Sequence, residues 1–446
     1  MATESVTANP KSKGAQFLEK ARITAGRKWS VVVILFLFML LHQTDKLLIG
    51  PLTTPIMNTF HINEAQMGIV FTGALLVGGI FYPIWGWLYD RYARGRILAI
   101  AATIWGATTW ISAIVPTYGL FVATRASTGI DDASYPGAYS LVSDYFGPTK
   151  RGKIISILQL SAFLGGIAGM GLAMATRDTL GWRGIFYITG GLGIVMAFVM
   201  FFGIKELPRG QSEPEMEGKE KVVTKPFSWA TVKTLLSRPT LAILFAQQFF
   251  HVFPFTAINS WFFRYLETER KLDSGMVFVA AGLMAVMGAI SGVVAGTLGD
   301  ALFKRFMRGR LMVAVFGIIG MMVFFTLMLN TPVANLNTFL ILEAIAGFFW
   351  SFEWPNMVST LQDVTEPEVR STAHGIIGVA ENVGSALAPM VAGFIAVGST
   401  LKNAMQIITL SAWSVGTILL VILLIIIPKD IRRLREVMRK RAEENG

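Results

Sequence analysis

The chain has 446 residues, of which 53% are hydrophobic and only 15% are charged. This composition excludes an ordinary soluble multidomain protein and predicts an all-α protein that crosses a membrane many times. The net charge of +11 does not indicate nucleic acid binding, because the basic residues gather in short segments between apolar ones. Cysteine is absent, which excludes disulfides, thiol catalysis and cysteine metal sites.

The first half of the chain is predicted to form a six-helix bundle over residues 29–204. It follows a polar, basic N-terminal tail, residues 1–28, which lacks the short apolar segment and cleavage site of a signal peptide. The first span begins near Trp29, and the next five are expected at about 65–89, 95–115, 118–145, 153–175 and 183–204. Each is long enough to cross a bilayer as a helix.

A second bundle is predicted over residues 239–427, after a polar linker of mixed charge at 205–238. Its spans are expected at about 240–264, 275–299, 310–329, 334–361, 371–397 and 403–427. The basic tail, 428–446, is expected to be a helix that lies on the inner membrane surface or, equally, a solvated cytoplasmic helix. On this topology 31 of the 39 Lys and Arg residues lie on one side, which predicts cytoplasmic termini in an inner or plasma membrane.

A basic motif occurs once in each half. It reads G-x-L-x-D-R-x-x-R-x-R over residues 86–96, and an echo begins 210 residues later at Gly296, Leu298 and Asp300. A plain basic loop is the alternative, but repetition in register after a hydrophobic span argues against it. The motif resembles the loop signature of the major facilitator superfamily, whose fold is two pseudo-symmetric six-helix bundles. The resemblance implies a conformational gating role for Gly86, Asp90, Arg91, Arg94, Gly296 and Asp300.

Ionisable residues occur within predicted spans, where each one needs a partner or a wet cavity. His42, Asp45 and Lys46 lie within about one turn of span 1. In span 4, Arg125 and Asp132 are seven residues apart and share a helical face, so the spacing selects Asp132 rather than Asp131 to face Arg125. These groups form either a structural ion-pair network or a proton relay with a headgroup site, and Asp45 has a further alternative at the lipid interface.

The second half offers a different set of polar residues within its spans. They are candidates for binding substrate together with His42, Lys46 and Arg125, and they comprise Gln247, His251, Glu343, Glu353, Glu381 and Asn382. The three glutamates predict an acidic wall that faces the basic residues of the first half. Each of these residues alone is more often an interhelical hydrogen bond than a ligand contact.

Several stretches resemble the spinster-type branch of the superfamily. They are Thr44-Asp45-Lys46, GIDDASYP at 129–136, KELPRG at 205–210 and RSTAHG at 370–375. The resemblance implies a carrier of lysolipids or sphingoid lipids in which the acids of spans 1 and 4, Asp45 and Asp132, take part in proton coupling. Lys46 replaces an arginine of that branch, Asp132 a glutamate and Asp131 a glycine. The sugar-acid and phthalate-type anion symporters form a rival resemblance that is looser after span 6.

We therefore expect a twelve-helix secondary transporter of a small amphiphilic organic molecule, coupled to protons and surrounded by membrane lipids. An organic-anion:proton symporter and a multidrug efflux antiporter are the alternatives. No metalloprotease motif, phosphate-binding loop or serine nucleophile elbow occurs, so we expect no enzyme activity, no cofactor and no metal. We expect a monomer that alternates access to a midplane site between its halves.

Overall fold

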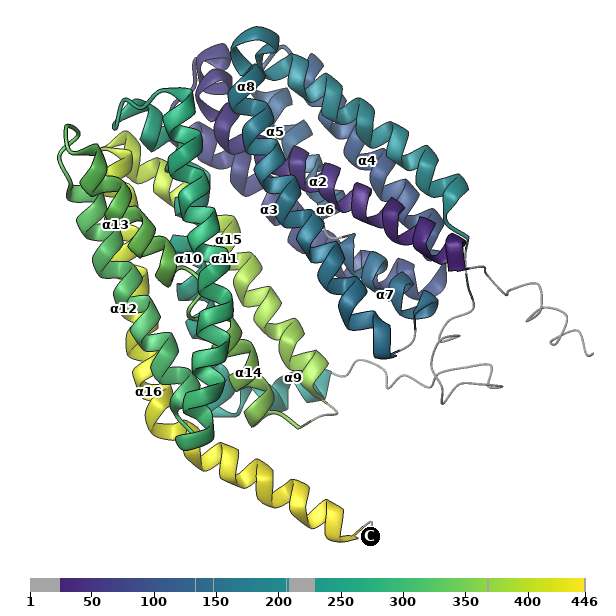
Figure 1. Cartoon of the computed structure of the whole chain (residues 1–446), viewed down its shortest axis with the longest axis vertical. Helices are drawn as coiled ribbons and strands as arrows, with labels where there is room; N and C mark the ends of the chain where they lie inside the picture. Colours follow the sequence, from purple (N-terminus) through teal and green to yellow (C-terminus); the bar gives the residue numbers. More distant parts are fainter. Residues whose placement is uncertain are drawn as a thin grey trace, which may run out of the picture.

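The computed structural model describes residues 25–132, 134–146, 148–205, 207, 229–366 and 369–444. Most of the predicted N-terminal tail and of the linker lies outside these residues, and so does the side chain of Asp90. The first half contains α2 (Ala25–Phe60), α3 (Glu64–Arg91), α4 (Arg94–Ile114), α5 (Tyr118–Ser127), α6 (Gly129–Asp132), α7 (Tyr135–Tyr145) and α8 (Pro148–Gly203). Figure 1 shows these helices as one bundle.

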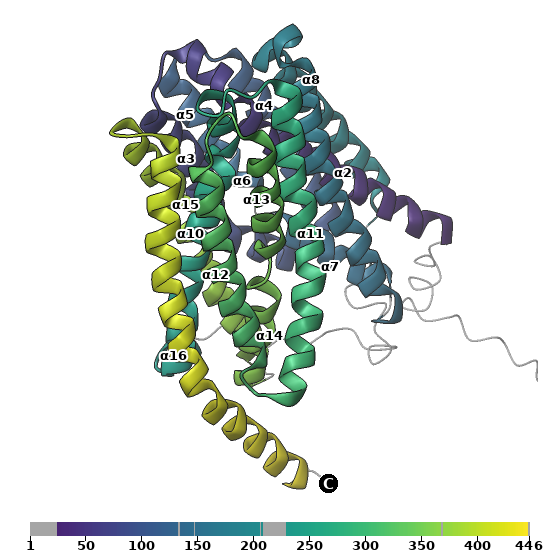
Figure 2. The ribbon, with the colours of Figure 1, turned by 60° about the vertical axis from the view of Figure 1, so that its left-hand side comes forward.

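The second half forms the neighbouring bundle (Figure 1). The short helix α9 (Trp229–Leu236) precedes it within the predicted linker. The bundle contains α10 (Pro239–Thr268), α11 (Ser274–Arg305), α12 (Gly309–Asn330), α13 (Leu336–Phe349), α14 (Trp354–Val364), α15 (Arg370–Val397) and α16 (Leu401–Glu444). Figure 2 shows the last part of α16 projecting beyond the bundle, so the predicted tail helix continues α16 without a break.

Twelve membrane crossings follow from these helices. Ten described helical stretches are long and apolar enough to span a bilayer. One of them is α8, which contains two spans because Gly181 has φ 66° and interrupts the helix. The broken series α5, α6 and α7 supplies the remaining crossing between α4 and α8. The expected all-α fold of twelve spans is therefore confirmed.

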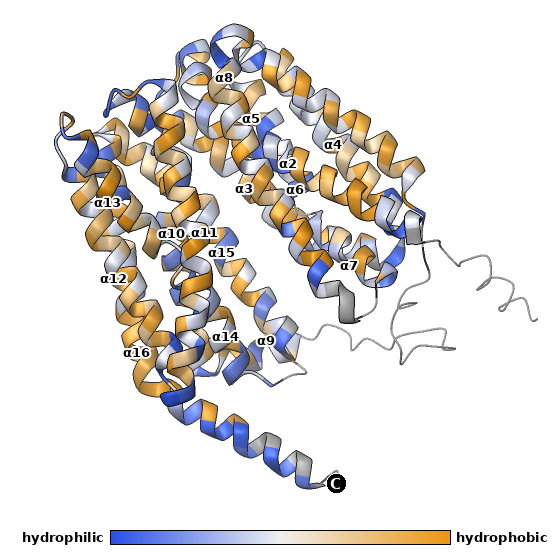
Figure 3. Ribbon diagram, viewed as in Figure 1, coloured by the Kyte–Doolittle hydropathy of each residue, from blue (hydrophilic) through white to orange (hydrophobic). Residues whose placement is uncertain are grey.

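Each bundle exposes an apolar surface to its surroundings. Figure 3 shows hydrophobic residues along the outward faces of the helices and hydrophilic residues at both ends and along the last part of α16. Large side chains such as Ile80, Phe202, Phe316 and Ile425 are among the most exposed hydrophobic residues. An apolar surface of this extent is stable in contact with lipid rather than water. The protein is therefore an integral membrane protein with many crossings.

The bundles have two distinct ends. We call the end that holds α9 and the end of α7 the linker end, and the end that holds His61, Gly181 and Lys271 the far end. Close contacts join the bundles toward the far end. A Cβ on Gly68 of α3 would lie 2.7 Å from the carbonyl oxygen of Pro389 in α15, and a Cβ on Gly393 of α15 would lie 2.4 Å from that of Glu64. Only glycine, which lacks a Cβ, allows the helices to approach this closely.

Glycine also brings α2 and α8 together inside the first bundle. A Cβ on Gly165 of α8 would lie 2.2 Å from the carbonyl oxygen of Leu40, and one on Gly169 would lie 2.4 Å from that of Thr44. The hydroxyl of Thr44 donates to the carbonyl oxygen of Gly165 at 3.0 Å. This approach fixes the part of α2 that carries His42, Asp45 and Lys46.

We expect Gly165→Ala to destabilise the protein by about 1–3 kcal/mol, because the added methyl group meets backbone that cannot move aside easily. Gly152→Ala is the matched control. Gly152 lies on the same helix, and a Cβ there would meet no atom within 4 Å. The thermal unfolding of the two purified variants measures the difference. Equal unfolding midpoints would contradict the close packing of α2 and α8.

Candidate functional site

The fourth crossing is interrupted where its acidic residues lie. Pro136 has no N–H to bond the carbonyl of Asp132 four residues earlier, and α7 begins at Tyr135 with this proline in its first turn. Side chains of α3 bond carbonyls at the interruption: the indole of Trp85 donates to Ile130, and the hydroxyl of Tyr89 donates to Ser134 at 2.9 Å. The break therefore holds Asp131 and Asp132 at the interior of the bundle.

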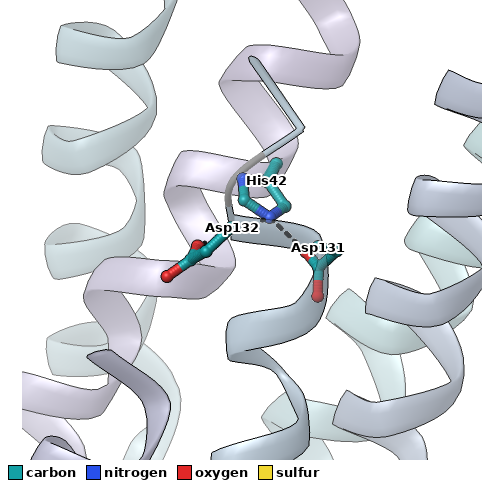
Figure 4. A group of neighbouring side chains, drawn as sticks. All are labelled: His42, Asp131 and Asp132. Carbon is teal, nitrogen blue, oxygen red and sulfur yellow. Dashed lines mark hydrogen bonds and ion pairs between the residues drawn. The ribbon is translucent and has the colours of Figure 1, made fainter. Parts of the chain in front are cut away.

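His42 and Asp131 form a buried pair. The Nε2 atom of His42 lies 2.6 Å from Oδ2 of Asp131, and its Nδ1 atom lies 2.5 Å from the hydroxyl of Tyr135. Figure 4 shows the imidazole between the two acidic side chains. Phe38 stacks on the His42 ring and Trp105 meets it edge-on, so the pair lies in an aromatic pocket.

Asp132 has a second base as its partner. Nζ of Lys46 lies 3.0 Å from its Oδ2, and Nε2 of His42 lies 3.9 Å from its Oδ1. The Asp132 side chain is 18% exposed, whereas that of Asp131 is 2% exposed. Of the two acids, Asp132 is therefore the one that solvent or a ligand reaches more easily.

His42, Asp131 and Asp132 also satisfy the simplest geometric condition for a metal site. One ligand atom from each lies within 4.8 Å of the others. Lys46 and Tyr135 already contact Asp132 and His42, however, and Lys46 supplies a positive charge at this place. The geometry fits a network of hydrogen bonds and charges without requiring an ion.

Asp45 and Arg125 occupy separate positions in the same bundle. The carboxylate of Asp45 accepts hydrogen bonds from Thr109 of α4 at 3.0 Å and from Thr189 of α8 at 2.5 Å. The guanidinium of Arg125 lies over the ring of Phe186, 5.2 Å from its centroid, and its Nη1 atom is buried without a hydrogen-bond partner. The seven-residue spacing predicts that Asp132 faces Arg125. In the structure Asp132 pairs with Lys46 instead, because α6 does not continue the helix that carries Arg125.

A cavity of about 720 Å³ lies between the bundles. The first bundle contributes every charged group of the lining, and apolar side chains such as Phe71, Trp105 and Phe163 lie among them. The charged groups are His42, Asp45, Lys46, Arg125, Asp131 and Asp132. The second bundle contributes mainly large apolar side chains, which include Phe255, Phe262, Phe263, Met284 and Trp350. A few small polar side chains, Thr256, Asn259, Ser260, Ser351 and Ser385, interrupt this apolar wall. All charged groups of the cavity therefore lie on the wall of the first bundle, and the wall of the second bundle carries none. We call these the charged wall and the aromatic wall.

The expected acidic wall of the second bundle is not present. Glu343, Glu353 and Glu381 are absent from the cavity lining, and so are Gln247, His251 and Asn382. Glu343 is completely buried, and both of its carboxylate oxygens lack a hydrogen-bond partner. Glu353 turns instead toward Gln248 and His251 within its own bundle. Asn382 packs opposite Gly79 of α3, where the bundles meet.

The predicted gating residues lie at the linker end. Arg94 forms an ion pair with Asp144 of α7, and Arg91 lies over the ring of Trp87 at 4.8 Å. Asp300 pairs with Arg310 at 2.6 Å inside the second bundle, and Arg310 also pairs with Asp363 of α14. A Cβ on Gly86 would meet nothing within 4 Å, and one on Gly296 would lie 3.8 Å from Cβ of Pro355.

Sequence reasoning missed several residues of these networks. Asp144 and Asp363 occupy matching positions in the two halves, at the same separation as Pro136 and Pro355. Alignment of the halves around those prolines would have found them. Asp131, Thr109 and Thr189 had no comparable signal, because their roles depend on the break in the fourth crossing and on contacts with other helices.

Two ion pairs join the bundles at the far end. Arg177 of α8 pairs with Glu267 of α10, and Arg264 of α10 pairs with Glu64 of α3 at 2.7 Å. Thr54 of α2 contacts both, since it donates to Glu267 at 2.6 Å and lies 3.3 Å from Arg264. The side chains of Arg177 and Glu267 are each only 11% exposed. This network links the two bundles at the far end.

Comparison with known proteins places these features in a family context. The family model for the Major Facilitator Superfamily matches residues 34–389 and 302–443. Protein spinster homolog 1 of Xenopus tropicalis is 27% identical over 389 residues, which cover 82% of this chain and 72% of that protein. The Probable galactarate/D-glucarate transporter GudP of Escherichia coli (strain K12) is 26% identical over 421 residues, which cover 87% of this chain and 90% of that protein.

A solved structure shares the arrangement of helices. It is a bacterial homolog to the human lysosomal transporter Spinster, in an inward-facing and unoccupied conformation. The two structures align with a TM-score of 0.75 and 20% sequence identity, over 93% of this chain and 99% of the other. At this identity the likeness establishes the fold.

We expect Glu267→Gln to open the far end, because the buried guanidinium of Arg177 loses its partner and the closed state is destabilised by up to about 3 kcal/mol. Spin labels on cysteines introduced at the exposed positions Leu180 and Lys271 report the distance between the bundles. Arg439→Gln is the control, because it breaks an exposed pair with Glu443 outside the bundles. An unchanged distance distribution in Glu267→Gln would show that the network does not hold the far end closed.

Proposed function

Since the chain belongs to the Major Facilitator Superfamily, we propose that it is a secondary transporter that moves an amphiphilic organic molecule across the membrane together with protons. The observation that carries this proposal is the division of the cavity into a charged wall and an aromatic wall. Its volume of about 720 Å³ lies within the usual range of sites for small organic molecules.

The two walls match the two parts of an amphiphile. Lys46 and Arg125 attract an acidic headgroup, and Asp132 beside them accepts a cationic group of the same headgroup. Phe255, Phe263 and Trp350 face them with apolar surface that removes a hydrocarbon chain from water. A zwitterionic lysolipid combines these features in one molecule. The resemblance of the sequence motifs to the spinster-type branch implies the same substrate class.

Proton coupling is proposed to act through Asp132. A proton on Asp132 neutralises its carboxylate and releases Lys46, whose ammonium group is then free to bind an anionic headgroup. A ligand drives a conformational change only through different affinities for the two states. Asp132 fits this requirement because it is the more exposed acid and contacts both Lys46 and His42. Asp45, held by Thr109 and Thr189, is its proposed partner within the same bundle.

The second candidate is symport of an organic anion such as a sugar acid. The unpartnered Nη1 atom of Arg125 favours it, because a carboxylate at that place would satisfy a buried donor. The alignment with the Escherichia coli galactarate/D-glucarate transporter covers 90% of that protein and supports the anion symporter as well. The aromatic wall argues against it, since a sugar acid presents hydroxyl groups on every side.

The proposed setting is the inner or plasma membrane, with a monomer among lipids and both termini in the cytoplasm. The bias of Lys and Arg toward the linker end supports this orientation. In this orientation the far end, where the ion pairs join the bundles, faces outward.

The substrate class is tested by stabilisation of the purified protein. We expect lysophosphatidylcholine to raise the unfolding midpoint increasingly as its concentration exceeds the dissociation constant, because a ligand that binds only the folded state stabilises it. Glucarate is the competing probe, and Phe263→Ala is the variant that should lose the lysolipid effect alone. Stabilisation by glucarate, without any by the lysolipid, would favour the anion symporter.

The coupling acid is tested by flux in proteoliposomes. We expect Asp132→Asn to abolish substrate accumulation driven by a pH gradient. In wild-type protein, each pH unit of gradient supports a concentration ratio of about tenfold for every proton coupled to the substrate. Exchange of substrate down its own gradient should persist, because asparagine resembles the protonated acid. Glu443→Gln is the control, since that side chain is 67% exposed near the end of α16, outside the bundles. Asp45→Asn should impair both kinds of flux.

If Asp132→Asn still accumulates substrate in response to the gradient, the pair with Lys46 is structural. If wild-type protein accumulates substrate equally well without a pH gradient, proton coupling as a whole is contradicted.

A further inference from the structure

A second histidine–carboxylate pair lies inside the second bundle. Nε2 of His251 in α10 lies 3.1 Å from Oε2 of Glu353, directly before α14. The other oxygen of Glu353 accepts a hydrogen bond from Gln248 at 2.8 Å. The side chain of Glu353 is 1% exposed and that of His251 is 11% exposed. The cavity lining includes neither residue.

The internal repeat relates this pair to the one in the first bundle. His42 and His251 are 209 residues apart, and the two basic motifs are 210 residues apart. Asp131 and Glu353 both lie at an interruption of the fourth helix of their bundle, shortly before Pro136 and Pro355 respectively. Each half thus joins its first and fourth helices through a histidine and a carboxylate.

The two pairs differ in the charges around them. In the first bundle Lys46 and Arg125 accompany the acids. In the second bundle Glu381 of α15 lies near enough to repel Glu353 electrostatically, and none of the ion pairs of the described residues links a lysine or arginine to either glutamate. On the neighbouring helix α16, Trp413 donates to the backbone oxygen of His251, and Gly416 lies beside Gln247.

Two buried carboxylates with a single imidazole need a positive charge from elsewhere, because isolated charge in an apolar interior costs several kcal/mol. Some polar atoms of this cluster also lack partners. Buried atoms without a hydrogen bond include Nδ1 of His251, Oε1 of Glu381 and Oε1 of Gln248. An added proton would both reduce the negative charge and convert one acceptor into a donor.

We propose that His251, Glu353 and Glu381 form a second proton-binding site, one helical turn from the cavity. Glu381 and the cavity-lining Ser385 share a face of α15, as do His251 and the cavity-lining Phe255 on α10. Thr256 donates to Ser385 at 3.2 Å, so the two helices meet at that level. A proton reaches the cluster from the cavity past Glu381, which is half-buried. Binding here needs no substrate.

Infrared difference spectroscopy on the full-length protein in lipid tests this directly. Glutamate labelled with ¹³C at the side-chain carboxyl shifts the bands of Glu residues away from those of Asp residues. We expect a band of a protonated glutamate at neutral pH that disappears on alkalinisation, and we expect Glu353→Gln to remove it. Every protein compared also carries Glu343→Gln, because Glu343 is buried without hydrogen-bond partners and would contribute a band of its own. Asp132→Asn, in the first bundle, should leave the band unchanged, so the result does not depend on the proposed coupling acid or on the substrate.

Three outcomes would overturn the proposal. They are the absence of such a band in protein that carries Glu343→Gln alone, its persistence in Glu353→Gln, and its loss at constant pH when sodium replaces choline, which would indicate a sodium site. Should Glu353→Gln fail to fold, Glu381→Gln serves instead. Removal of that neighbouring charge should lower the pH at which the band disappears by about one unit, and an unchanged pH would contradict the cluster.

Discussion

The cost of an unpaired charge in an apolar interior governs the architecture of this protein. A bilayer offers no water to an ionisable side chain, so each one must find a partner or a wet cavity. The first bundle meets this condition by placing Lys46 against Asp132 and His42 against Asp131. These contacts require the fourth crossing to be interrupted, because adjacent residues on a continuous helix point about 100° apart. Pro136 makes the interruption, and side chains of α3 bond the backbone there.

Close helix packing makes the charged site rigid. Gly165 and Gly169 bring the backbone of α8 against α2, where His42, Asp45 and Lys46 lie within one turn. At the far end Gly68 and Gly393 allow α3 and α15 to touch across the bundles. The ion pairs of Arg177 and Arg264 lie at the same end. The molecule is therefore held by backbone contact within a bundle and by both backbone contact and charge between bundles.

The sequence predicted the crossings and their order well, because twenty apolar residues between basic turns leave few alternatives to a spanning helix. The internal repeat of the Gly86 and Gly296 motifs also predicted two equivalent halves. Partner choice within the site was harder. The seven-residue spacing of Arg125 and Asp132 assumed a continuous helix, and the break before Tyr135 removed that assumption. Likewise, no local pattern shows that Glu353 faces Gln248 rather than the cavity, since this depends on how α10 and α14 pack.

The separation of the cavity into a charged wall and an aromatic wall has an evolutionary consequence. Each wall belongs to a different bundle, so substitutions at Lys46 or Arg125 alter one part of the site while Phe263 and Trp350 stay unchanged. Residues that do not touch usually contribute independently to free energy. Selection can therefore change the preferred charge of a ligand without changing the preferred length of its hydrocarbon part. Paralogues with this layout would diversify along two independent axes, one encoded in each half of the gene.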